Sequence, residues 1–230
     1  MKQGILYGIG VGPGDPELMT RKAVRIIEEC DLIAAPQSEG NEKTAMTIAA
    51  EFVKNKPVMY CDMPMTRDKT KMDASHDKAA DMICEQLDAG KTVVFLTLGD
   101  PTIYSTYWYV HKRVLARGYD ARLIPGVPSF CAAAAVAGVA LVEGSDMLHV
   151  VPASHTSTDE GLAMPGTKVL MKAGRSILEV REKLRADGKL ENAVLVERAT
   201  MPGERVVRDL DELDDPTGYC SVIIVKEEHK

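Results

Sequence analysis

Two short glycine-containing segments are the part of this sequence best suited to hold a small ligand. The first reads GVGPGDP over residues 10–16 and the second reads LGDP over residues 98–101, and each directly follows an apolar run. Glycine has no Cβ, so the backbone of such a segment can approach a ligand closely. In open sheets of parallel strands, ligands bind beyond the carboxyl ends of the strands. We therefore expect Gly12 and Gly99 to lie side by side and to line one binding site.

The first segment departs from the GxGxxG pattern of dinucleotide-binding loops. Its third glycine, Gly14, comes one place early, and Asp15 occupies the position that the pattern reserves for glycine. A carboxylate at that position would repel a pyrophosphate. The acidic residue expected about twenty positions later could only be Asp31, which lies at the start of the next predicted strand rather than at its end. The sequence therefore disfavours a nicotinamide cofactor, and a nucleotide-binding oxidoreductase is the alternative from a different class.

The other reactive residue types form no pattern that indicates a metal site or an activated nucleophile. The cysteines, at positions 30, 61, 84, 131 and 220, include no CxxC pair, and their odd number favours reduced thiols. The histidines, at positions 76, 111, 149, 155 and 229, include no HExxH helix, and the sequence contains no GxSxG segment. We expect no bound metal.

Composition and charge narrow the class of protein further. Hydrophobic residues make up 45% of the 230 residues and charged residues 27%, as in ordinary globular proteins. The 28 Lys and Arg residues against 34 Asp and Glu residues give a net charge of −6, which disfavours a nucleic-acid partner. No apolar run approaches the ~18 residues of a membrane helix, and the N-terminal run is too short and glycine-rich for a signal peptide. We expect a cytoplasmic protein with no membrane partner.

The first 125 residues alternate short apolar runs with amphipathic stretches. The predicted strands span residues 5–9, 32–35, 58–60, 92–96 and 121–124, and the predicted helices span residues 17–29, 42–53, 75–87 and 104–115. This alternation is typical of β-α-β units and of a mainly parallel sheet with helices on both faces. It places both glycine segments at the carboxyl ends of strands.

The pattern changes beyond residue 125. A helix rich in small residues is predicted over 129–137, followed by strands over 148–151, 168–171, 193–196, 204–207 and 220–225 and a helix over 176–185. Closely spaced strands with few helices favour a mixed sheet. The predicted fold class is therefore α/β with two lobes. The N-terminal lobe, residues 1–125, is a mainly parallel αβα sheet domain, and the C-terminal lobe, residues 126–230, is an α+β domain with a mixed sheet. The acidic run over 204–215 is predicted to be exposed surface.

Four segments, taken together, resemble the tetrapyrrole methylase family, whose members use S-adenosylmethionine. They are Gly10–Asp15, Gly99–Pro101, Ile124–Phe130 and Tyr219–Val225, and their order and spacing match over essentially the whole chain. Within the family, the run GDPTIYSTY over residues 99–107 looks like the methyltransferases of cobalamin biosynthesis that act at C-20 of precorrin-2 or of its cobalt form. The length of the segment over residues 61–77 also looks like that subgroup.

The resemblance implies that S-adenosylmethionine lies in a cleft between the two lobes. The implied cofactor-binding residues are Gly99, Asp100, Pro101, Thr102, Ile103, Ser129, Phe130, Met171, Ala199 and Thr200. Many members of the family have Ser or Thr where this chain has Pro128, which leaves Ser129 as the hydroxyl of that segment. The resemblance also implies a homodimer and a small-molecule tetrapyrrole as the partner.

The reaction implied by the resemblance moves a methyl group from a sulfonium to a carbon of the tetrapyrrole, which requires alignment more than a side-chain nucleophile. A proton must then leave the methylated carbon, and Asp100 and Tyr107 are the candidate catalytic residues. Asp100 could equally be a turn residue whose carboxylate binds local amides. The candidate substrate-binding residues are Gly12, Pro13, Gly14, Tyr104 and Arg67.

The aromatic residues of this segment are the candidates for a flat wall against a macrocycle. Tyr104, Tyr107 and Trp108 are expected to share one face of a helix, because they stand three and four positions apart. The same spacing is typical of core or of a subunit interface, so both interpretations stay open.

Other assignments keep the fold and the cofactor but change the partner. They are a uroporphyrinogen methyltransferase, a diphthine synthase and a ribosomal-RNA methyltransferase, of which the last requires a basic face that the net charge of −6 disfavours. A non-catalytic binding module would make no use of two converging loops. The motifs do not distinguish a metal-free from a cobalt-loaded tetrapyrrole.

Overall fold

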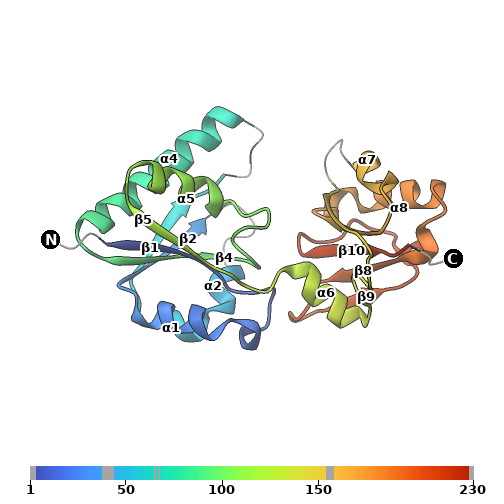
Figure 1. Cartoon of the computed structure of the whole chain (residues 1–230), viewed down its shortest axis with the longest axis horizontal. Coiled ribbons are helices and arrows are strands. Elements are labelled where there is room, and N and C mark those ends of the chain that lie inside the picture. The colour runs from blue at the N-terminus through green and yellow to red at the C-terminus, as the bar shows by residue number, and fades with distance from the viewer. Residues whose placement is uncertain (1–3, 38–43, 65, 67, 154–157, 228–230) are drawn as a thin grey trace. The chain divides into compact units, whose positions relative to one another are not determined.

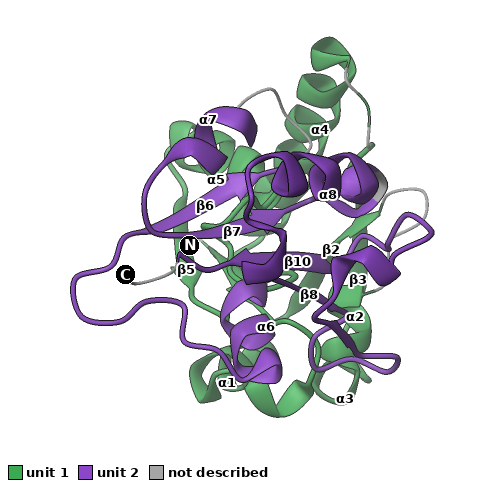
Figure 2. Cartoon of the chain, turned by 90° about the vertical axis from the view of Figure 1, so that its right-hand side faces the viewer, with its two compact units in different colours: residues 1–128 green, residues 129–230 purple. Residues whose placement is uncertain are grey.

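The structure is a computed structural model that describes residues 4–37, 44–64, 66, 68–153 and 158–227 (Figure 1). The chain forms two compact units, Met1–Pro128 and Ser129–Lys230, coloured separately in Figure 2. Each unit is built around its own five-stranded sheet. Among the helices of the described ranges, none combines the length and the apolar character that a membrane crossing requires.

The first unit is a parallel sheet with helices on both faces. Its strands lie in the order β3-β2-β4-β1-β5, and all the pairings between them are parallel. The strands are β1 (Ile5–Gly10), β2 (Leu32–Gln37), β3 (Val58–Asp62), β4 (Thr92–Thr97) and β5 (Asp120–Ile124). The helices are η1 (Pro16–Leu18), α1 (Arg21–Glu29), α2 (Thr44–Ile48), α3 (Ala50–Val53), α4 (Lys69–Asp88) and α5 (Tyr107–Ala116). The predicted parallel sheet of this lobe is confirmed.

The connections that leave β1 and β4 go to opposite faces of this sheet. The connection after β1 runs through α1 on one face, whereas the connection after β4 runs through α5, which packs beside α4 on the other face (Figure 1). Because β1 and β4 are neighbours in the sheet, their carboxyl ends form a switch point of the strand order. Open α/β sheets bind ligands at such points.

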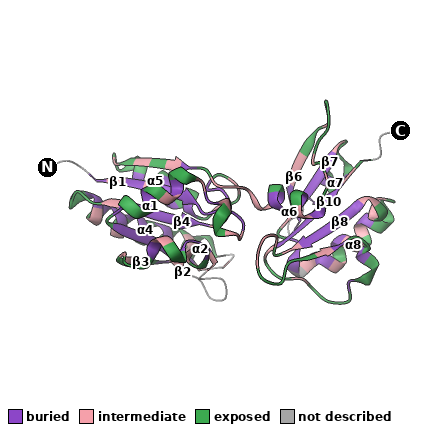
Figure 3. Cartoon of the chain, turned by 90° about the horizontal axis from the view of Figure 1, so that it is seen from below, coloured by how far each residue is buried: buried purple, intermediate pink, exposed green. Residues whose placement is uncertain are grey.

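One hydrophobic core of the first unit lies between the sheet and the pair α4 and α5. Buried apolar residues of the strands, such as Leu6, Val93 and Phe95, pack there against Ile83 of α4 and Val110 of α5. The strands β1, β2 and β4 of the first sheet and β7, β8 and β10 of the second are largely buried, whereas the outer strands are more exposed (Figure 3). Fully burying one such side chain contributes about 1.5–3 kcal/mol, so this core holds the ends of the strands in fixed positions.

Three helix boundaries of this unit differ from the predicted ones because polar side chains cap the backbone. The predicted helix over 17–29 is divided, since Asp15 accepts a hydrogen bond from the N–H of Glu17 (2.8 Å) to start η1, and Thr20 accepts one from Ala23 (3.1 Å) to start α1. Helix α4 already begins at Lys69, because the carboxylate of Asp68 accepts hydrogen bonds from the first turn.

The second unit is a mixed sheet whose strands lie in the order β6-β7-β10-β8-β9. The pair β6 and β7 is parallel and the other pairs are antiparallel. The strands are β6 (Leu148–Pro152), β7 (Thr167–Met171), β8 (Ala193–Glu197), β9 (Arg205–Val207) and β10 (Ser221–Val225). The helices are α6 (Ser129–Ala137), α7 (Thr158–Ala163), η2 (Gly174–Ser176), α8 (Ile177–Ala186), η3 (Leu190–Asn192) and η4 (Leu210–Glu212). The predicted mixed sheet is confirmed, whereas α7 was not predicted.

Helices cover both faces of the second sheet. Leu162 of α7 and Val180 of α8 join the core that contains Leu170, Leu195 and Ile223 of the strands. Helix α6 contacts β8 and β10 from the opposite face (Figure 1).

Candidate active site

Gly12 and Gly99 form an isolated antiparallel bridge beyond the carboxyl ends of β1 and β4. The N–H of Gly99 donates to the carbonyl of Gly12 at 2.8 Å, and the N–H of Gly12 donates to the carbonyl of Gly99 at 3.2 Å. Both residues have positive φ, 79° and 67°, which glycine adopts without steric cost. The expectation that these two glycines are neighbours is confirmed, and they stand at the switch point of the sheet.

A third loop, after β5, reaches the same place. A Cβ on Gly126 of that loop would lie 2.2 Å from the carbonyl oxygen of Gly99, and a Cβ on Gly10 would lie 2.4 Å from the same oxygen. The backbones of the three loops are therefore in direct contact, with no room for a side chain at either position. The contribution of Gly126 was not predicted, although it too is a glycine that follows a strand.

The carboxylate of Asp100 is buried among these loops, at 8% exposure. Its Oδ2 accepts a hydrogen bond from the N–H of Gly126 at 3.0 Å, and its Oδ1 accepts one from the N–H of Thr102 at 2.8 Å and another from the Thr102 hydroxyl. These contacts agree with the interpretation of Asp100 as a turn residue whose carboxylate binds nearby backbone amides. Asp100 links the loop after β4 to the loop after β5.

Tyr107, the second candidate catalytic residue, lies in the core of the first unit. It is 1% exposed, its ring centroid is 5.0 Å from that of Phe95, and its hydroxyl is hydrogen bonded to Nδ1 of His111 at 3.0 Å. A Cβ on Gly8 would lie 1.9 Å from the Tyr107 ring, so Gly8 leaves space for that ring. Burial raises the pKa of the Tyr107 hydroxyl. The geometry gives Tyr107 a packing role, and we leave it out of the catalytic machinery.

The expected aromatic helix face is wrong. Helix α5 begins only at Tyr107, and Tyr104 precedes it with a positive φ of 48° and an exposed side chain. A left-handed residue ends the helical geometry, so the three- and four-residue spacing no longer places Tyr104 above its neighbours. Trp108 is exposed and stacks on His111, with ring centroids 5.2 Å apart.

The other predicted residues of the first unit occupy the same loops. Pro13 and Pro101 are buried, Gly14 and Ile103 are half-buried, and Thr102 is exposed. Arg67 lies outside the described residues.

The predicted residues of the second unit gather at one edge of its sheet. Met171 ends β7 opposite Val222, and Glu197 ends β8 opposite Ser221, so both strands end beside the first residues of β10. Ala199 and Thr200 follow directly after β8 and are half-buried. Ser129 and Phe130 form the start of α6, which contacts β8 and β10.

Strained backbone marks the same segments. Four non-glycine residues of the described part have positive φ, namely Tyr104 (48°), Lys172 (61°), Arg198 (51°) and Thr200 (63°). Tyr104 belongs to the loop after β4, and the other three follow β7 and β8 at the edge that carries Met171 and Ala199. Such conformations cost about 1–3 kcal/mol each and are concentrated at functional sites. This signal is independent of the motifs and points to the same loops.

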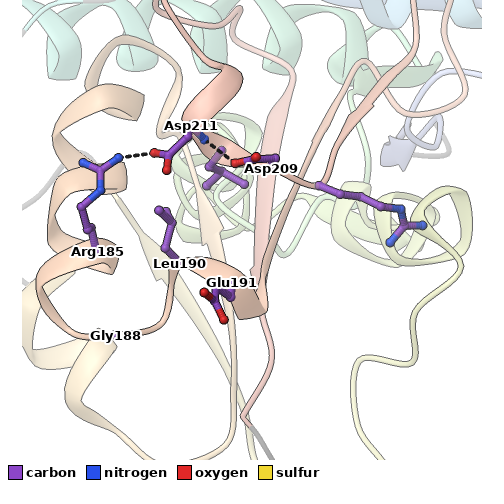
Figure 4. A pocket seen from close by; sticks show the side chains of 8 residues that line it. Arg185, Gly188, Leu190, Glu191, Asp209 and Asp211 are labelled. Atoms are coloured by element: carbon purple, nitrogen blue, oxygen red, sulfur yellow. Dashed lines mark hydrogen bonds and ion pairs between the residues drawn. The ribbon is translucent and has the colours of Figure 1, made fainter.

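A separate pocket of about 680 Å³ lies on the second unit, beside the amino end of β8 (Figure 4). It is lined by Arg185, Gly188, Leu190, Glu191, Arg208, Asp209, Leu210 and Asp211. Arg185 and Asp211 form an ion pair across it. Because η3 leads into β8 at this end, the pocket lies at the opposite edge of the sheet from Met171 and Thr200, and it is not part of the candidate site.

A family model described as Tetrapyrrole (Corrin/Porphyrin) Methylases matches residues 5–214 of the chain. The chain belongs to the tetrapyrrole methylase family. The match spans both units and includes three of the four segments, and the predicted family is confirmed.

Several tetrapyrrole methylases are similar to the chain over nearly its full length. A precorrin-2 C(20)-methyltransferase from a Sinorhizobium species is 33% identical over 96% of this chain and 95% of its own. A cobalt-precorrin-2 C(20)-methyltransferase from Salmonella typhimurium is 32% identical over 98% of this chain and 97% of its own. A solved uroporphyrin-III C-methyltransferase from Thermus thermophilus, complexed with S-adenyl homocysteine, is 21% identical with a TM-score of 0.72, covering 97% of this chain and 98% of that one. This last likeness shows the shared fold.

Proposed function

We propose that this tetrapyrrole methylase transfers a methyl group from S-adenosylmethionine to C-20 of precorrin-2 or cobalt-precorrin-2. The observation that carries the proposal is the pairing of Gly12 with Gly99 at the switch point of the first sheet. It occurs in a chain that is 33% and 32% identical to two C(20)-methyltransferases over nearly their whole lengths. The proposal therefore joins a ligand-binding geometry to a specific family resemblance.

The residues of the loop after β4 fit S-adenosylmethionine. S-adenosylmethionine, when bound, supplies a methyl group on a positively charged sulfur that a nucleophilic carbon can accept. The half-buried Ile103 offers apolar surface, and Thr102 is exposed beside it. The Asp100 carboxylate is already bonded to Thr102 and Gly126, so the loop has its shape before any ligand arrives, which lowers the entropy cost of binding. A Cβ on Gly10 or Gly126 would destroy that shape.

The cofactor contacts proposed for the second unit are Met171 at the end of β7, Ala199 and Thr200 after β8, and Ser129 and Phe130 at the start of α6. Support comes from the backbone strain at Arg198, Thr200 and Lys172. Met171 and Ala199 also lie at one edge of one sheet, as two contacts to a single small molecule must.

In the mechanism that we propose, the chain acts by alignment. The loop Gly99–Ile103 holds the methyl donor, while Gly12, Pro13 and Gly14 face the tetrapyrrole from the paired loop. Holding two reactants in line can contribute about 7–11 kcal/mol toward lowering a barrier. We assign Asp100 to positioning, because both of its oxygens accept hydrogen bonds from the loops. The proton that leaves the methylated carbon then passes to water.

Two measurements test the proposal. Isothermal titration calorimetry should show binding of S-adenosylhomocysteine to the purified protein, and a methyl-transfer assay should yield a product methylated at C-20, identified by mass and NMR. Metal-free and cobalt-loaded precorrin-2 are compared side by side in that assay, since relatives of both kinds are similar to the chain. Absence of S-adenosylhomocysteine binding, or methylation at another carbon, would contradict the proposal.

We also infer a homodimer that acts in the cytoplasm. The family resemblance implies the homodimer, and the odd number of cysteines, which favours reduced thiols, supports the compartment. Light scattering coupled to gel filtration should give the mass of two chains, and the mass of one chain would contradict the dimer.

A further inference from the structure

The loop that joins β8 to β9 holds two strained residues at the edge where the second unit is proposed to contact the cofactor. It spans residues 198–204, and both Arg198 (φ 51°) and Thr200 (φ 63°) adopt the left-handed conformation without being glycine. Conformations of this kind persist only where the surrounding structure imposes them. The contacts that impose these left-handed conformations therefore help to shape this edge of the second sheet.

Backbone contacts hold the two ends of the loop. The N–H of Arg198 donates to the carbonyl of Cys220 at 2.7 Å, which fixes the start of the loop to β10, and the N–H of Met201 donates to the carbonyl of Arg198 at 2.8 Å. At the base, Arg205 of β9 lies opposite Glu197 of β8, with 3.7 Å between Nη1 and Oε2. These contacts close the loop at both of its ends.

The carboxylate of Glu204 adds a contact at the centre of the loop. Its Oε2 accepts a hydrogen bond from the backbone N–H of Thr200 at 2.7 Å. The bond therefore connects Glu204, the last residue of the loop, to Thr200 at the centre of the loop. Hydrogen bonds to an ionised acceptor are shorter and stronger than neutral ones. Glu204 is itself exposed, and the sequence placed it in an acidic run predicted to be mere surface.

We propose that Glu204 is a positioning residue for cofactor binding, whose carboxylate holds Thr200 in its left-handed conformation and so presents Ala199 and Thr200 to S-adenosylmethionine. The inference rests on the proposed function. It adds a residue that makes no contact with the cofactor yet sets its affinity.

The first test uses the protein without any ligand. Hydrogen exchange of the Thr200 amide, followed by NMR, should be slow in the wild type and faster in Glu204→Ala, while the amides of β8 and β10 keep their protection. Equal exchange of the Thr200 amide in both proteins would overturn the inference, because the carboxylate would then not hold that group.

The second test measures affinity for S-adenosylhomocysteine by calorimetry. Glu204→Ala should raise the Kd by roughly fivefold to tenfold, as expected for one hydrogen bond at an exposed position, and Glu204→Gln should recover part of the loss because its amide oxygen still accepts. The matched control is Glu191→Ala, which removes an exposed carboxylate from the opposite edge of the same sheet and should leave the Kd unchanged. In turnover, the KM for S-adenosylmethionine should rise while kcat changes little.

A double-mutant cycle separates this role from a general loss of structure. In a Thr200→Gly background the left-handed conformation carries no steric cost, so Glu204→Ala should raise the Kd less there than in the wild type. Equal effects in both backgrounds would overturn the inference. If the wild type binds S-adenosylhomocysteine and Glu204→Ala binds it equally well, the role of Glu204 is wrong and the proposed function stands. If the wild type does not bind it, both fail.

Discussion

The carboxylate of Asp100 accepts a hydrogen bond from the backbone N–H of Gly126 at 3.0 Å. Because β1 lies between β4 and β5 in the sheet, this bond spans the end of β1, where Gly10 has no side chain to obstruct it. A single carboxylate thus ties together the loops that follow the two strands flanking β1. The bond makes Asp100 a determinant of the site's shape.

Asp100→Ala should lower the free energy of unfolding by about 2–3 kcal/mol, because three donors lose a buried charged acceptor. Asp100→Asn retains one acceptor and should cost less, in stability and in turnover. Urea unfolding and steady-state kinetics check both variants. If Asp100 were instead the general base, both variants would lose about 10²–10⁴ in kcat, and an equal loss of that size in the two would refute the positioning role.

Gly126→Ala should destabilise the protein by about 1–3 kcal/mol or more, because its Cβ would meet the carbonyl oxygen of Gly99 at 2.2 Å. Gly218→Ala is the matched control, since a Cβ there meets nothing within 4 Å. Thermal unfolding of the two variants should differ clearly. Similar melting temperatures would mean that the three loops are not in the contact described.

Tyr107→Phe should leave kcat and its pH profile unchanged, because the hydroxyl is buried and bonded to His111 rather than directed at a substrate. The variant should lose about 1 kcal/mol of stability through the lost hydrogen bond. Gly8→Ala should be more harmful to folding, since a Cβ would enter the Tyr107 ring. A large drop in kcat for Tyr107→Phe, with stability preserved, would restore Tyr107 to the catalytic residues.

Stability should fall as the pH falls below about 6.5, the ordinary pKa of histidine. Burial lowers the pKa of His76, an effect to which nearby Arg113 adds, and burial also lowers the pKa of His111. Between the ordinary pKa and the lowered values the unfolded chain binds more protons than the native state, so acid favours unfolding there, and the loss is complete below the lowered values.

Urea unfolding between about pH 5 and pH 8 measures this dependence, in a window where carboxylates contribute little. The ring of His76 stacks on that of Tyr109, with their centroids 4.9 Å apart. His76→Phe keeps an aromatic ring at this position and should reduce the dependence of the free energy of unfolding on pH. An unchanged slope would remove His76 from the explanation.

Much of the framework could be predicted because its signals are local. The apolar runs that became β1, β4 and β10 are bounded by glycine or polar residues, and the helix Ser129–Ala137 has its predicted bounds. The meeting of Gly12 and Gly99 followed from topology alone, because both loops leave the carboxyl ends of parallel strands. Hydrophobic periodicity and the glycine and proline residues between elements indicate strands, helices and loops well.

What could not be predicted depends on contacts between distant residues or on strained backbone. The left-handed φ of Tyr104, which removes it from α5, has no sequence signal, because only glycine and asparagine announce such conformations. The acidic run over 204–215 indicated exposed surface, and exposure was right for Glu204, yet its bond to Thr200 appears only in three dimensions. The spacing of Tyr107 was compatible with an aromatic wall against the substrate, and only the packing of its ring against Gly8 shows that it belongs to the core.

The strand order of the first unit also governs when that unit can fold during synthesis. Among the described strands, β1 pairs with β4 and β5, with Ile5 opposite Thr92 and Asp120, so β1 leaves the ribosome well before the partners encoded downstream of it. At ordinary translation speeds the wait is on the order of ten seconds, during which an apolar strand stays unpaired. Nascent chains of this protein should therefore depend on chaperones, and the pairing that builds the ligand site should be among the last events in the folding of the first unit.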